Sequence, residues 1–492
     1  METAVSESSD LLRDYPLLAG PDEMFDRDGT VRAKYAQLAS RLGRWSLDEY
    51  HARQAAADLD QLNGGVTFTV YQDDAGTERI FPFSLIPRVI DAEEWARLEA
   101  GLVQRVSALN RFLADVYTEQ RCVRDGVVPV DVLGQSEGFN LRAVGFVPSL
   151  GVYAHIAGID LIRDREGTYR VLEDNLRTPS GVSYVLENRR TMLNAVPDLF
   201  PAGSVAPVDD YPDRLLEMLI AVRPSSVSAE ETRAVILTPG SQNSAYFEHS
   251  FLARQMGIEL VEGRDLIVHD QRVYLRATTG LERVHVIYRR VDDDFLDPVA
   301  FRADSALGVA GLVDAYRSGQ VTIVNAIGNG IADDKVVYRF IPDVIRYFLG
   351  EEPIIPNVDT WVGSQPADLA HMIEHLGDLV VKPANGSGGY GIVIGPQSTA
   401  AEIEEARDRV RRNPSGYIAQ PLQEFSTIPT FNGTRLEPRR ADLRPFVVTG
   451  ASSWVLPGGL TRVASDPTSY IVNSSQGGGS KDTWVLRQGW EA

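Results

Sequence analysis

One short glycine-rich segment, residues 379–395, limits most strongly what this chain can fold into. It reads LVVKPANGSGGYGIVIG, so apolar residues stand on both sides of a loop that is rich in glycine. Because glycine has no Cβ, successive backbone N–H groups of such a loop can approach and surround phosphate oxygens. We therefore predict a strand, a phosphate-binding loop and a second strand. The loop residues expected to contact phosphate are Asn385, Gly386, Ser387, Gly388, Gly389 and Gly391.

The lysine of this segment distinguishes it from a P-loop of the Walker type. In that motif, lysine and serine or threonine end the loop and a helix follows. Here Lys382 precedes the loop, and the apolar residues 392–395 follow it. This order favours a glycine hairpin that folds over a nucleotide, with Lys382 reaching the phosphates from the preceding strand. A flexible surface hairpin without a ligand is the alternative.

An acidic hairpin is predicted far earlier in the chain. Residues 151–162 and 168–175 flank the charged turn RDREG, a pattern typical of two antiparallel strands. Glu173 and Asn175 are two residues apart on one strand and therefore point to one face, and Asp160 lies on the partner strand. Two carboxylates and an amide oxygen suit Mg²⁺, which leaves coordination positions for ATP phosphates. A solvated polar face on an edge hairpin is the alternative.

Both hairpins resemble parts of the ATP-grasp ligases, such as D-alanine–D-alanine ligase. Residues 158–181 are similar to their final core hairpin, which carries Asp, Glu-x-Asn and a Pro-Gly turn, although Pro-Ser-Gly stands at that turn here. Residues 379–395 resemble their phosphate-covering loop with its ATP lysine. The segment ADDKVVYRF is similar to an earlier ATP-binding lysine site, which implies that role for Lys335.

Further segments extend the resemblance. DLRPFVV is similar to the strand that carries a phosphate-facing arginine, here Arg444, and YIAQPLQEF is similar to the linker that holds adenine. Arg462 and Asn473 stand where the resemblance implies phosphate or metal contacts. The linker residues implied to bind the nucleotide are Gln420, Pro421, Leu422 and Gln423.

The order of these segments departs from the usual family. There the metal-binding hairpin follows the glycine loop, whereas here it precedes it, as a circular permutation would produce. The chain therefore resembles the circularly permuted ATP-grasp family related to the ligase domain of glutathionylspermidine synthase, over roughly residues 63–486. The resemblance implies ATP and Mg²⁺ as cofactors and Lys382 and Arg444 as catalytic residues. It implies Asp160, Glu173 and Asn175 as metal ligands.

The implied reaction joins a carboxylate to an amine through an acyl-phosphate and releases ADP and phosphate. Its substrates would be small molecules or peptides, which the sequence does not name. Three alternatives stay open. They are a kinase that stops at phosphoryl transfer, a non-catalytic nucleotide-binding partner protein, and a zinc hydrolase. The zinc alternative depends on His371 and His375, whose spacing matches an inverted zinc-protease helix.

The predicted fold class is α/β with α+β lobes. It combines a circularly permuted ATP-grasp core, a doubly wound pre-ATP-grasp-like domain and an amino-terminal helical extension. A β-loop-α-β pattern at 234–266 indicates the doubly wound part, and apolar residues at helical spacing predict a helix at 91–117. Residues 335–348 are also expected to be helical. The expected domains are the extension at 1–62, a core lobe with the metal hairpin at 63–209, the α/β domain at 210–333, a glycine-loop lobe at 334–418 and the rest of the core lobe at 419–492.

Composition limits the partners. The formal net charge of −20 opposes nonspecific binding to nucleic acid or an anionic membrane, and no apolar run is long enough to span a bilayer. Residues 1–15 lack the pattern of a signal peptide, so a cytoplasmic location is expected. The single cysteine, Cys122, excludes an intrachain disulfide. Its neighbours Arg121 and Arg124 could lower its pKa, although an unreactive thiol is favoured. The sequence carries no signal that decides between a monomer and an oligomer.

Two weaker candidates concern substrate contacts. Ser241 and Asn243 lie in a loop between a predicted strand and a predicted helix, where N–H groups could bind an anion, or the loop is a plain helix cap. Arg289 and Arg290 end a strand and could hold a carboxylate as bidentate donors. Alternatively, the two arginines pair in solvent with the acidic residues 292–294.

Overall fold

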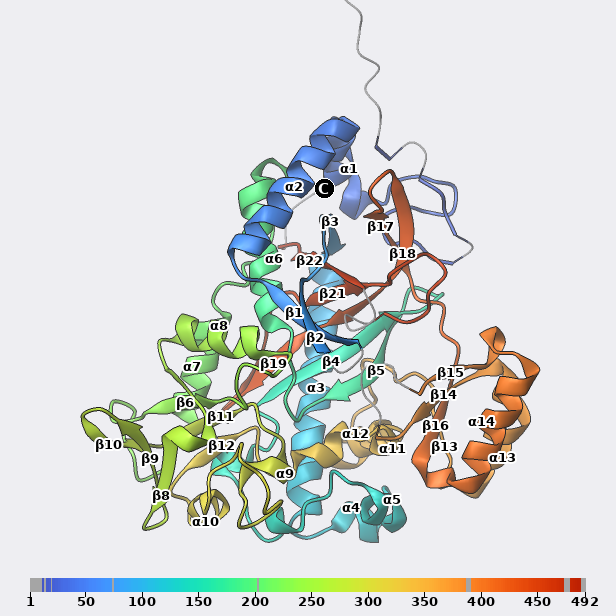
Figure 1. The fold of residues 1–492 in the computed structure, drawn as a ribbon. Helices are drawn as coiled ribbons and strands as arrows, with labels where there is room; N and C mark the ends of the chain where they lie inside the picture. The colour runs from blue at the N-terminus through green and yellow to red at the C-terminus, as the bar shows by residue number, and fades with distance from the viewer. Residues whose placement is uncertain are drawn as a thin grey trace, which may run out of the picture.

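The structure is a computed structural model that describes residues 11–12, 15–18, 20–72, 75–200, 203–385, 391–472 and 478–487. Figure 1 shows a central sheet, with an α/β unit on one side and a smaller sheet with two helices on the other. Among the helices that the structure describes, none combines the length and the apolarity that crossing a bilayer requires.

The central sheet is built from segments near both ends of the chain. Its strand order is β20-β19-β4-β18-β21-β22-β3, with β5 beside β4 and β17 beside β18. β4 pairs antiparallel with β18 and β19, and β3 pairs parallel with β22. Early and late segments are therefore direct neighbours, as a permuted order requires. The strands are β3 (Phe83–Ile90), β4 (Ile156–Arg163), β5 (Tyr169–Asn175), β17 (Thr427–Phe431), β18 (Leu436–Arg444), β19 (Phe446–Thr449), β20 (Ser453–Val455), β21 (Leu460–Val463) and β22 (Gly479–Val485).

A long helix, α3 (Ala92–Val116), packs against this sheet. It begins at Asp91, whose carboxylate accepts a hydrogen bond from the Glu94 N–H at 2.8 Å and so satisfies a donor of the first turn. Its apolar side chains share a core with β4, and the helix predicted at 91–117 is confirmed. The other elements of the first 200 residues are α1 (Ala36–Leu42), α2 (Leu47–Asn63), β1 (Thr67–Gln72), β2 (Ala75–Ile80), α4 (Arg121–Arg124), α5 (Val130–Gln135) and α6 (Val182–Ala195).

A parallel sheet with the order β12-β11-β6-β7 occupies the middle of the chain. β6 connects through α8 to β7, which confirms the β-loop-α-β unit predicted at 234–266. An antiparallel sheet, β8-β9-β10, accompanies it and was not predicted. The elements are α7 (Tyr211–Ala221), β6 (Ala234–Leu237), α8 (Tyr246–Met256), β7 (Glu259–Val261), β8 (Leu266–His269), β9 (Arg272–Ala277), β10 (Gly280–Val284), β11 (Val286–Arg289), α9 (Asp293–Leu296), α10 (Leu312–Arg317) and β12 (Thr322–Val324).

A sheet with the order β13-β16-β14-β15 carries the glycine-rich segment. β14 leads into the loop and β15 leaves it, with Val380 opposite Ile394, so the predicted hairpin is confirmed. The helix expected at 335–348 is two helices, because Pro342 near the start of α12 lacks the N–H that would continue α11. The elements are α11 (Lys335–Tyr338), α12 (Ile341–Leu349), β13 (Trp361–Val362), α13 (Pro366–His375), β14 (Leu379–Pro383), β15 (Val393–Ile394), α14 (Ala400–Arg412) and β16 (Tyr417–Pro421).

Candidate active site

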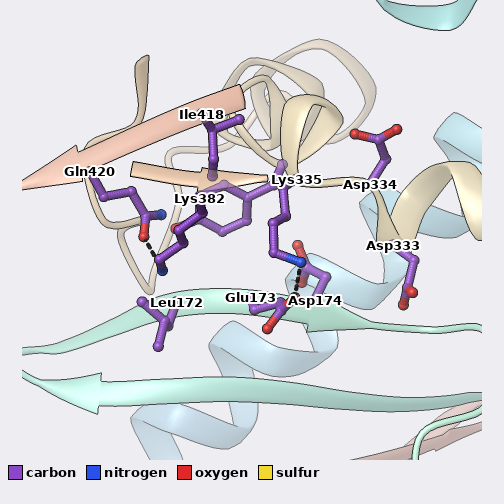
Figure 2. A pocket seen from close by; sticks show the side chains of 10 residues that line it. Leu172, Glu173, Asp174, Asp333, Asp334, Lys335, Lys382, Ile418 and Gln420 are labelled. Atoms are coloured by element: carbon purple, nitrogen blue, oxygen red, sulfur yellow. Dashed lines mark hydrogen bonds and ion pairs between the residues drawn. The ribbon is translucent and has the colours of Figure 1, made fainter. Parts of the chain in front are cut away.

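The glycine hairpin and the acidic hairpin meet at one cavity. Lys382 of β14 and Glu173 of β5 both line it, although they are far apart in the sequence. Figure 2 shows Glu173 reaching from β5 toward Lys335, with Lys382 beside Gln420 in the same space. Such a shared cavity is what a joint nucleotide and metal site requires. The lining residues are Leu172, Glu173, Asp174, Asp333, Asp334, Lys335, Tyr338, Lys382, Ile418 and Gln420.

Lys382 is held by a short chain of hydrogen bonds. Its Nζ donates to Gln420 Oε1 at 2.6 Å, and Gln420 Nε2 donates to Thr360 Oγ1 at 3.0 Å. The Thr360 hydroxyl in turn donates to the carbonyl of Val358 at 3.0 Å. Because that hydroxyl has one proton, it must accept from the Gln420 amide nitrogen, which leaves the Gln420 oxygen facing Lys382.

Burial dominates the charge state of Lys382. It lowers the pKa of this lysine to about 8, and the nearby charge of Lys335 acts in the same direction. The carboxylates of Glu173 and Asp160 oppose this effect. The Lys382 ammonium group therefore begins to lose its proton a little above neutral pH, and additional negative charge in the cavity would stabilise its charged form.

Lys335 and Glu173 form the ion pair of the cavity. The Lys335 Nζ lies 2.6 Å from Glu173 Oε1, and both side chains are partly exposed to the cavity. Lys335 begins α11, where the Asp334 side chain accepts a hydrogen bond from the Val336 N–H at 2.7 Å. That cap fixes the start of the helix and therefore the direction of Lys335.

The acidic hairpin has the predicted pairing. Asp160 lies opposite Glu173, and Gly158 lies opposite Asn175. A bulge between Asp160 and Leu161 places an extra residue in β5, so that Leu172 and Glu173 both line the cavity. Asn175 is not part of the lining, and its buried Nδ2 atom has no hydrogen-bond partner among the described residues.

Asp160 and Arg444 belong to a buried network of charges. Arg444 donates from Nε to Asp160 Oδ1 at 2.5 Å and from Nη2 to Oδ2 at 2.8 Å. Arg462 Nη2 lies 2.9 Å from the same Oδ2 and 2.5 Å from Asp442 Oδ2. Burial alone would raise the pKa of Asp160, but the two guanidinium groups outweigh it and hold that pKa below its usual range.

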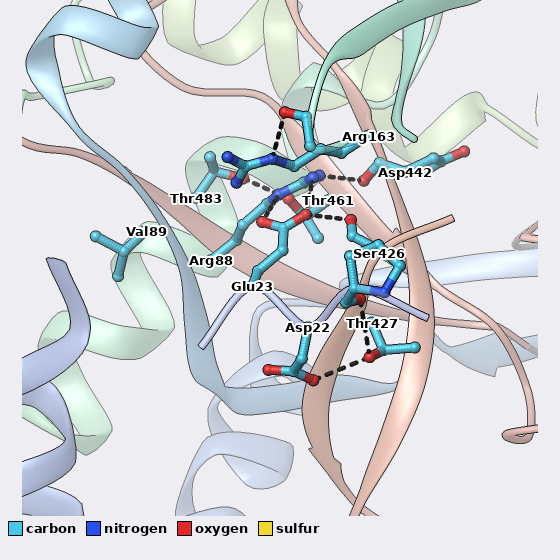
Figure 3. Close-up of polar contacts among 12 residues, drawn as sticks. Asp22, Glu23, Arg88, Val89, Arg163, Ser426, Thr427, Asp442, Thr461 and Thr483 are labelled. Atoms are coloured by element: carbon cyan, nitrogen blue, oxygen red, sulfur yellow. Dashed lines mark hydrogen bonds and ion pairs between the residues drawn. The ribbon is translucent and has the colours of Figure 1, made fainter. Parts of the chain in front are cut away.

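Behind this network lies a second buried ion pair, shown in Figure 3. Arg88 Nε donates to Glu23 at 2.9 Å, and Arg88 Nη1 donates to the carbonyl of Asp442 at 2.9 Å. Burial opposes ionisation of Glu23, yet Arg88 lowers the pKa of this carboxyl to about 2. The segment before α1 is therefore packed against the strand that carries Arg444, whereas the helices of the extension expected at 1–62 are α1 and α2.

The remaining predicted nucleotide contacts are either outside the lining of the cavity or outside the described residues. Asn385 is exposed at the start of the glycine loop, and Gly391 is exposed at its end with a φ of 73°, which glycine adopts without strain. Pro421 ends β16, and Leu422 follows; both are half-buried and outside the cavity lining. The predicted contacts that lie outside the described residues are Gly386, Ser387, Gly388, Gly389 and Asn473.

The weaker substrate candidates have structural partners. Arg289 is buried and donates to the carbonyls of Asn325 and Val291, and it pairs with Asp293 at 2.7 Å. Its ion pair is therefore interior, whereas the alternative prediction placed it in solvent. Asn243 Oδ1 accepts the N–H of Ala245 at 2.9 Å, the local bond of a capping loop. Ser241 is exposed in the same loop.

The surroundings of Cys122 and of two histidines bear on two further predictions. Burial raises the pKa of the Cys122 thiol, with Asp115 adding to the effect, so the unreactive thiol that the sequence favoured is confirmed and the alternative of a pKa lowered by Arg121 and Arg124 is wrong. The rings of His371 and His375 lie 4.5 Å apart, and His371 stacks on Trp361. In the described part of the chain, no three or more His, Cys, Asp or Glu residues are grouped so as to hold a metal ion.

Comparison with known proteins assigns these features to a family. The family model described as circularly permuted ATP-grasp type 2 matches residues 87–464. An uncharacterized protein of Synechocystis sp. is 51% identical over 467 residues, covering 95% of this chain and 97% of the relative. A provisionally named glutamate–cysteine ligase of Frankia alni is 43% identical over 471 residues, covering 96% of this chain but 54% of the relative.

A solved structure shares the fold. A glutathione synthetase-like effector from Globodera pallida, in its apo form, superposes with a TM-score of 0.58. The superposition covers 88% of this chain and 96% of the effector at 13% sequence identity. At that identity the likeness concerns the fold alone.

Proposed function

Because this chain belongs to the circularly permuted ATP-grasp type 2 family, as its sequence predicts, we propose that it is an ATP- and Mg²⁺-dependent ligase that joins a carboxylate to an amine. The observation that carries the proposal is the cavity in which Lys382, Lys335 and Glu173 meet. The expected α/β, ATP-grasp-like fold agrees with the family match and with the solved structure.

The distribution of charge in the cavity supports a triphosphate ligand. Asp174 is buried and binds Arg105 through both oxygens at 2.6 Å, so its charge is already neutralised. Asp333 likewise pairs with Arg177 at 2.7 Å. Two lysines then face the cavity with Glu173 as their nearest carboxylate, while the carboxylate of Asp334 accepts hydrogen bonds from the Val336 N–H and the Ser136 hydroxyl. The two lysines can therefore turn to the phosphates of a polyanion, although the whole chain is acidic.

The donor set also fits magnesium. The side chain of Glu173 is 33% exposed, and the buried nitrogen of the Asn175 amide has no hydrogen-bond partner among the described residues, so no bond from that nitrogen fixes the direction of the amide oxygen. Asp160 Oδ1 accepts one bond from Arg444 and keeps a free lone pair, because a carboxylate has about four acceptor sites. These residues would hold Mg²⁺, which on binding would screen the phosphates and stabilise charge during transfer.

The reaction places specific demands on the protein groups. The substrate carboxylate attacks the γ-phosphate of ATP and displaces ADP, and the amine then attacks the carbonyl carbon of the acyl-phosphate, loses a proton and displaces phosphate to give an amide. Lys382 and Lys335 would hold the phosphates, while Arg444, oriented by Asp160, would offer its remaining N–H groups to the developing charge. Positioning and charge neutralisation account for most of such catalysis, so no covalent nucleophile is required.

The relatives support the class of reaction but do not assign substrates to this chain. The Frankia relative has a name that describes amide formation between glutamate and cysteine, but this chain matches 54% of its length. The name therefore concerns a protein about twice as long. Glutamate, cysteine and their γ-linked dipeptide are accordingly sensible first substrates for a screen, together with other amino acids, peptides and amines.

The test is an ADP-release screen of these compounds with Mg-ATP, followed by mass spectrometry of the products. An amide product supports a ligase, whereas a stable phosphorylated product indicates a kinase. With an active pair in hand, Glu173→Gln should keep the fold but reduce turnover about a hundredfold, the scale for loss of a key electrostatic group. The matched control is Glu166→Gln, in the exposed turn of the same hairpin. Equal turnover in both variants would count against the proposed site.

A further inference from the structure

The loop that follows the acidic hairpin is fixed by side chains from three directions. Asn325 Nδ2 donates to the carbonyl of Leu176 at 2.6 Å, and Asp333 Oδ1 accepts the Leu176 N–H at 2.5 Å. Arg290 Nη1 donates to the carbonyl of Pro179 at 2.7 Å. These bonds hold the backbone between residues 176 and 179 in place, so a side chain from this loop has a defined origin.

Arg177 extends from this loop with part of its guanidinium uncommitted. Its Nε donates to Asp333 Oδ2 at 2.7 Å, and Asp333 lines the cavity described above. The side chain is nevertheless 50% exposed. Within the described residues, its terminal Nη atoms have no hydrogen-bond or ion-pair partner. One bond thus orients the plane of the guanidinium while its two outer nitrogen atoms stay accessible.

A guanidinium in this state is suited to a carboxylate. Its two Nη groups can donate in parallel to both oxygens of a carboxylate, and prior orientation reduces the entropy lost on binding. Arg177 also lies two residues after Asn175, the end of the acidic hairpin. Asp333 and, to a smaller extent, Asp292 and Asp293 raise the pKa of Arg177 against partial desolvation. Asp292 is exposed and places a negative charge in the same neighbourhood.

We propose that Arg177 binds a non-reacting carboxylate of the substrate, and that the substrate is an amino acid or a peptide in which this carboxylate lies near an ammonium group. Asp292 supplies the charge that favours the ammonium group. This inference rests on the proposed ligase function and adds a substrate class to it. The competing interpretation is that the pair of Arg177 and Asp333 only locks the loop, in which case removing the guanidinium would not alter recognition of a carboxylate.

The test measures binding, so that it does not depend on turnover. The full chain is saturated with a non-hydrolysable ATP analogue and Mg²⁺. It is then titrated with the twenty L-amino acids and with γ-L-glutamyl-L-cysteine, each beside its α-carboxamide, using saturation-transfer NMR. The variants are Arg177→Gln and Arg177→Lys. The matched control is Arg302→Gln, because Arg302 is 51% exposed and paired with Asp304 at 2.8 Å, away from the cavity.

At least one free acid should bind the wild type and Arg302→Gln alike, and bind Arg177→Gln about tenfold or more weakly. Its carboxamide should bind all variants equally weakly, and Arg177→Lys should be intermediate because it keeps the charge but lacks the planar fork. Equal binding of acids to Arg177→Gln and the wild type would overturn the inference. So would the failure of every acid to bind a chain that holds the ATP analogue. Failure of the analogue itself to bind would instead reject the proposed function.

Discussion

Raising the pH should weaken ATP binding through Lys382. Burial lowers the pKa of this lysine to about 8, and Lys335 adds to the effect. Glu173 and Asp160 favour its charged form, and Gln420 accepts its hydrogen bond without contributing a charge. ATP phosphates would add several negative charges to this balance. They should therefore return the Lys382 pKa toward its ordinary value, so that the bound lysine is fully charged.

The size of the change in ATP affinity follows from the fractions of charged and neutral Lys382 at each pH. With a pKa of about 8 in the free chain, the Kd for Mg-ATP should rise about eightfold between about pH 7.5 and about pH 9. Binding should take up about 0.9 proton at about pH 9 but about 0.2 proton at about pH 7.5, because the lysine must be recharged. The direction of the change follows: the affinity for Mg-ATP decreases as the pH rises through the pKa that Lys382 has in the ligand-free chain.

Isothermal titration calorimetry in two buffers with different ionisation enthalpies measures both quantities. The control is Lys382→Arg, whose guanidinium stays charged over this range and should show no proton uptake. A wild-type Kd that is constant over this pH interval, with no proton taken up, would refute the assignment of Lys382 as a phosphate-binding group in a desolvated cavity.

Two further predictions concern stability and reactivity. Asp160→Asn should destabilise the chain by about 3 kcal/mol, because Arg462 would stay buried with Asp442 as its remaining carboxylate and the half-buried Arg444 would lose its carboxylate partner. Urea unfolding followed by fluorescence measures this change, and an unchanged midpoint would contradict the ion-pair account. Cys122 should react with a thiol reagent only after unfolding, since its thiol is buried and its pKa is raised. Rapid labelling of the folded chain would show otherwise.

The parts of the site with local sequence signals were predictable. The acidic hairpin follows from two apolar segments around a charged turn, and Asp160 lies on the strand that pairs with Glu173, as expected. The glycine hairpin follows equally from its flanking strands. In both cases the relevant contacts lie within a few tens of residues, where strand period and turn chemistry decide the structure.

The hydrogen-bond and ion-pair partners of the predicted site residues could not be predicted from local sequence patterns. Arg444 and Asp160 are 284 positions apart, and no local pattern links residues at such a separation. The bulge that turns Leu172 toward the cavity was also missed, because an ideal strand would place it on the face opposite Glu173. Asp442 offered a weak signal, since it stands two residues before Arg444 on one strand and therefore shares its face.

The same reasoning explains why the packing of the residues before α1 could not be predicted. The extension was expected to be helical, as α1 and α2 are, yet Glu23 before them is 1% exposed and pairs with a fully buried Arg88. A buried carboxylate is stable only with such a partner, and that partner lies on β3, which joins the carboxyl-terminal strand β22 in parallel. Composition reports the polarity of a segment but not whether a distant strand neutralises it.

The ion pairs of the cavity differ in a way that bears on function. Asp174 and its partner Arg105 are both almost fully buried, so separating them would leave an unpaired charge in the interior. Lys335 and Glu173 are instead 17% and 33% exposed and face the cavity directly. When a polyanion and a cation bind together, Lys335 can form a new ion pair with a phosphate and Glu173 can bind the cation. Neither side chain is then left without a partner of opposite charge. Because the exposed pair can make this exchange at low energetic cost, ligand binding should reorganise Lys335 and Glu173 and leave Arg105 and Asp174 as they are.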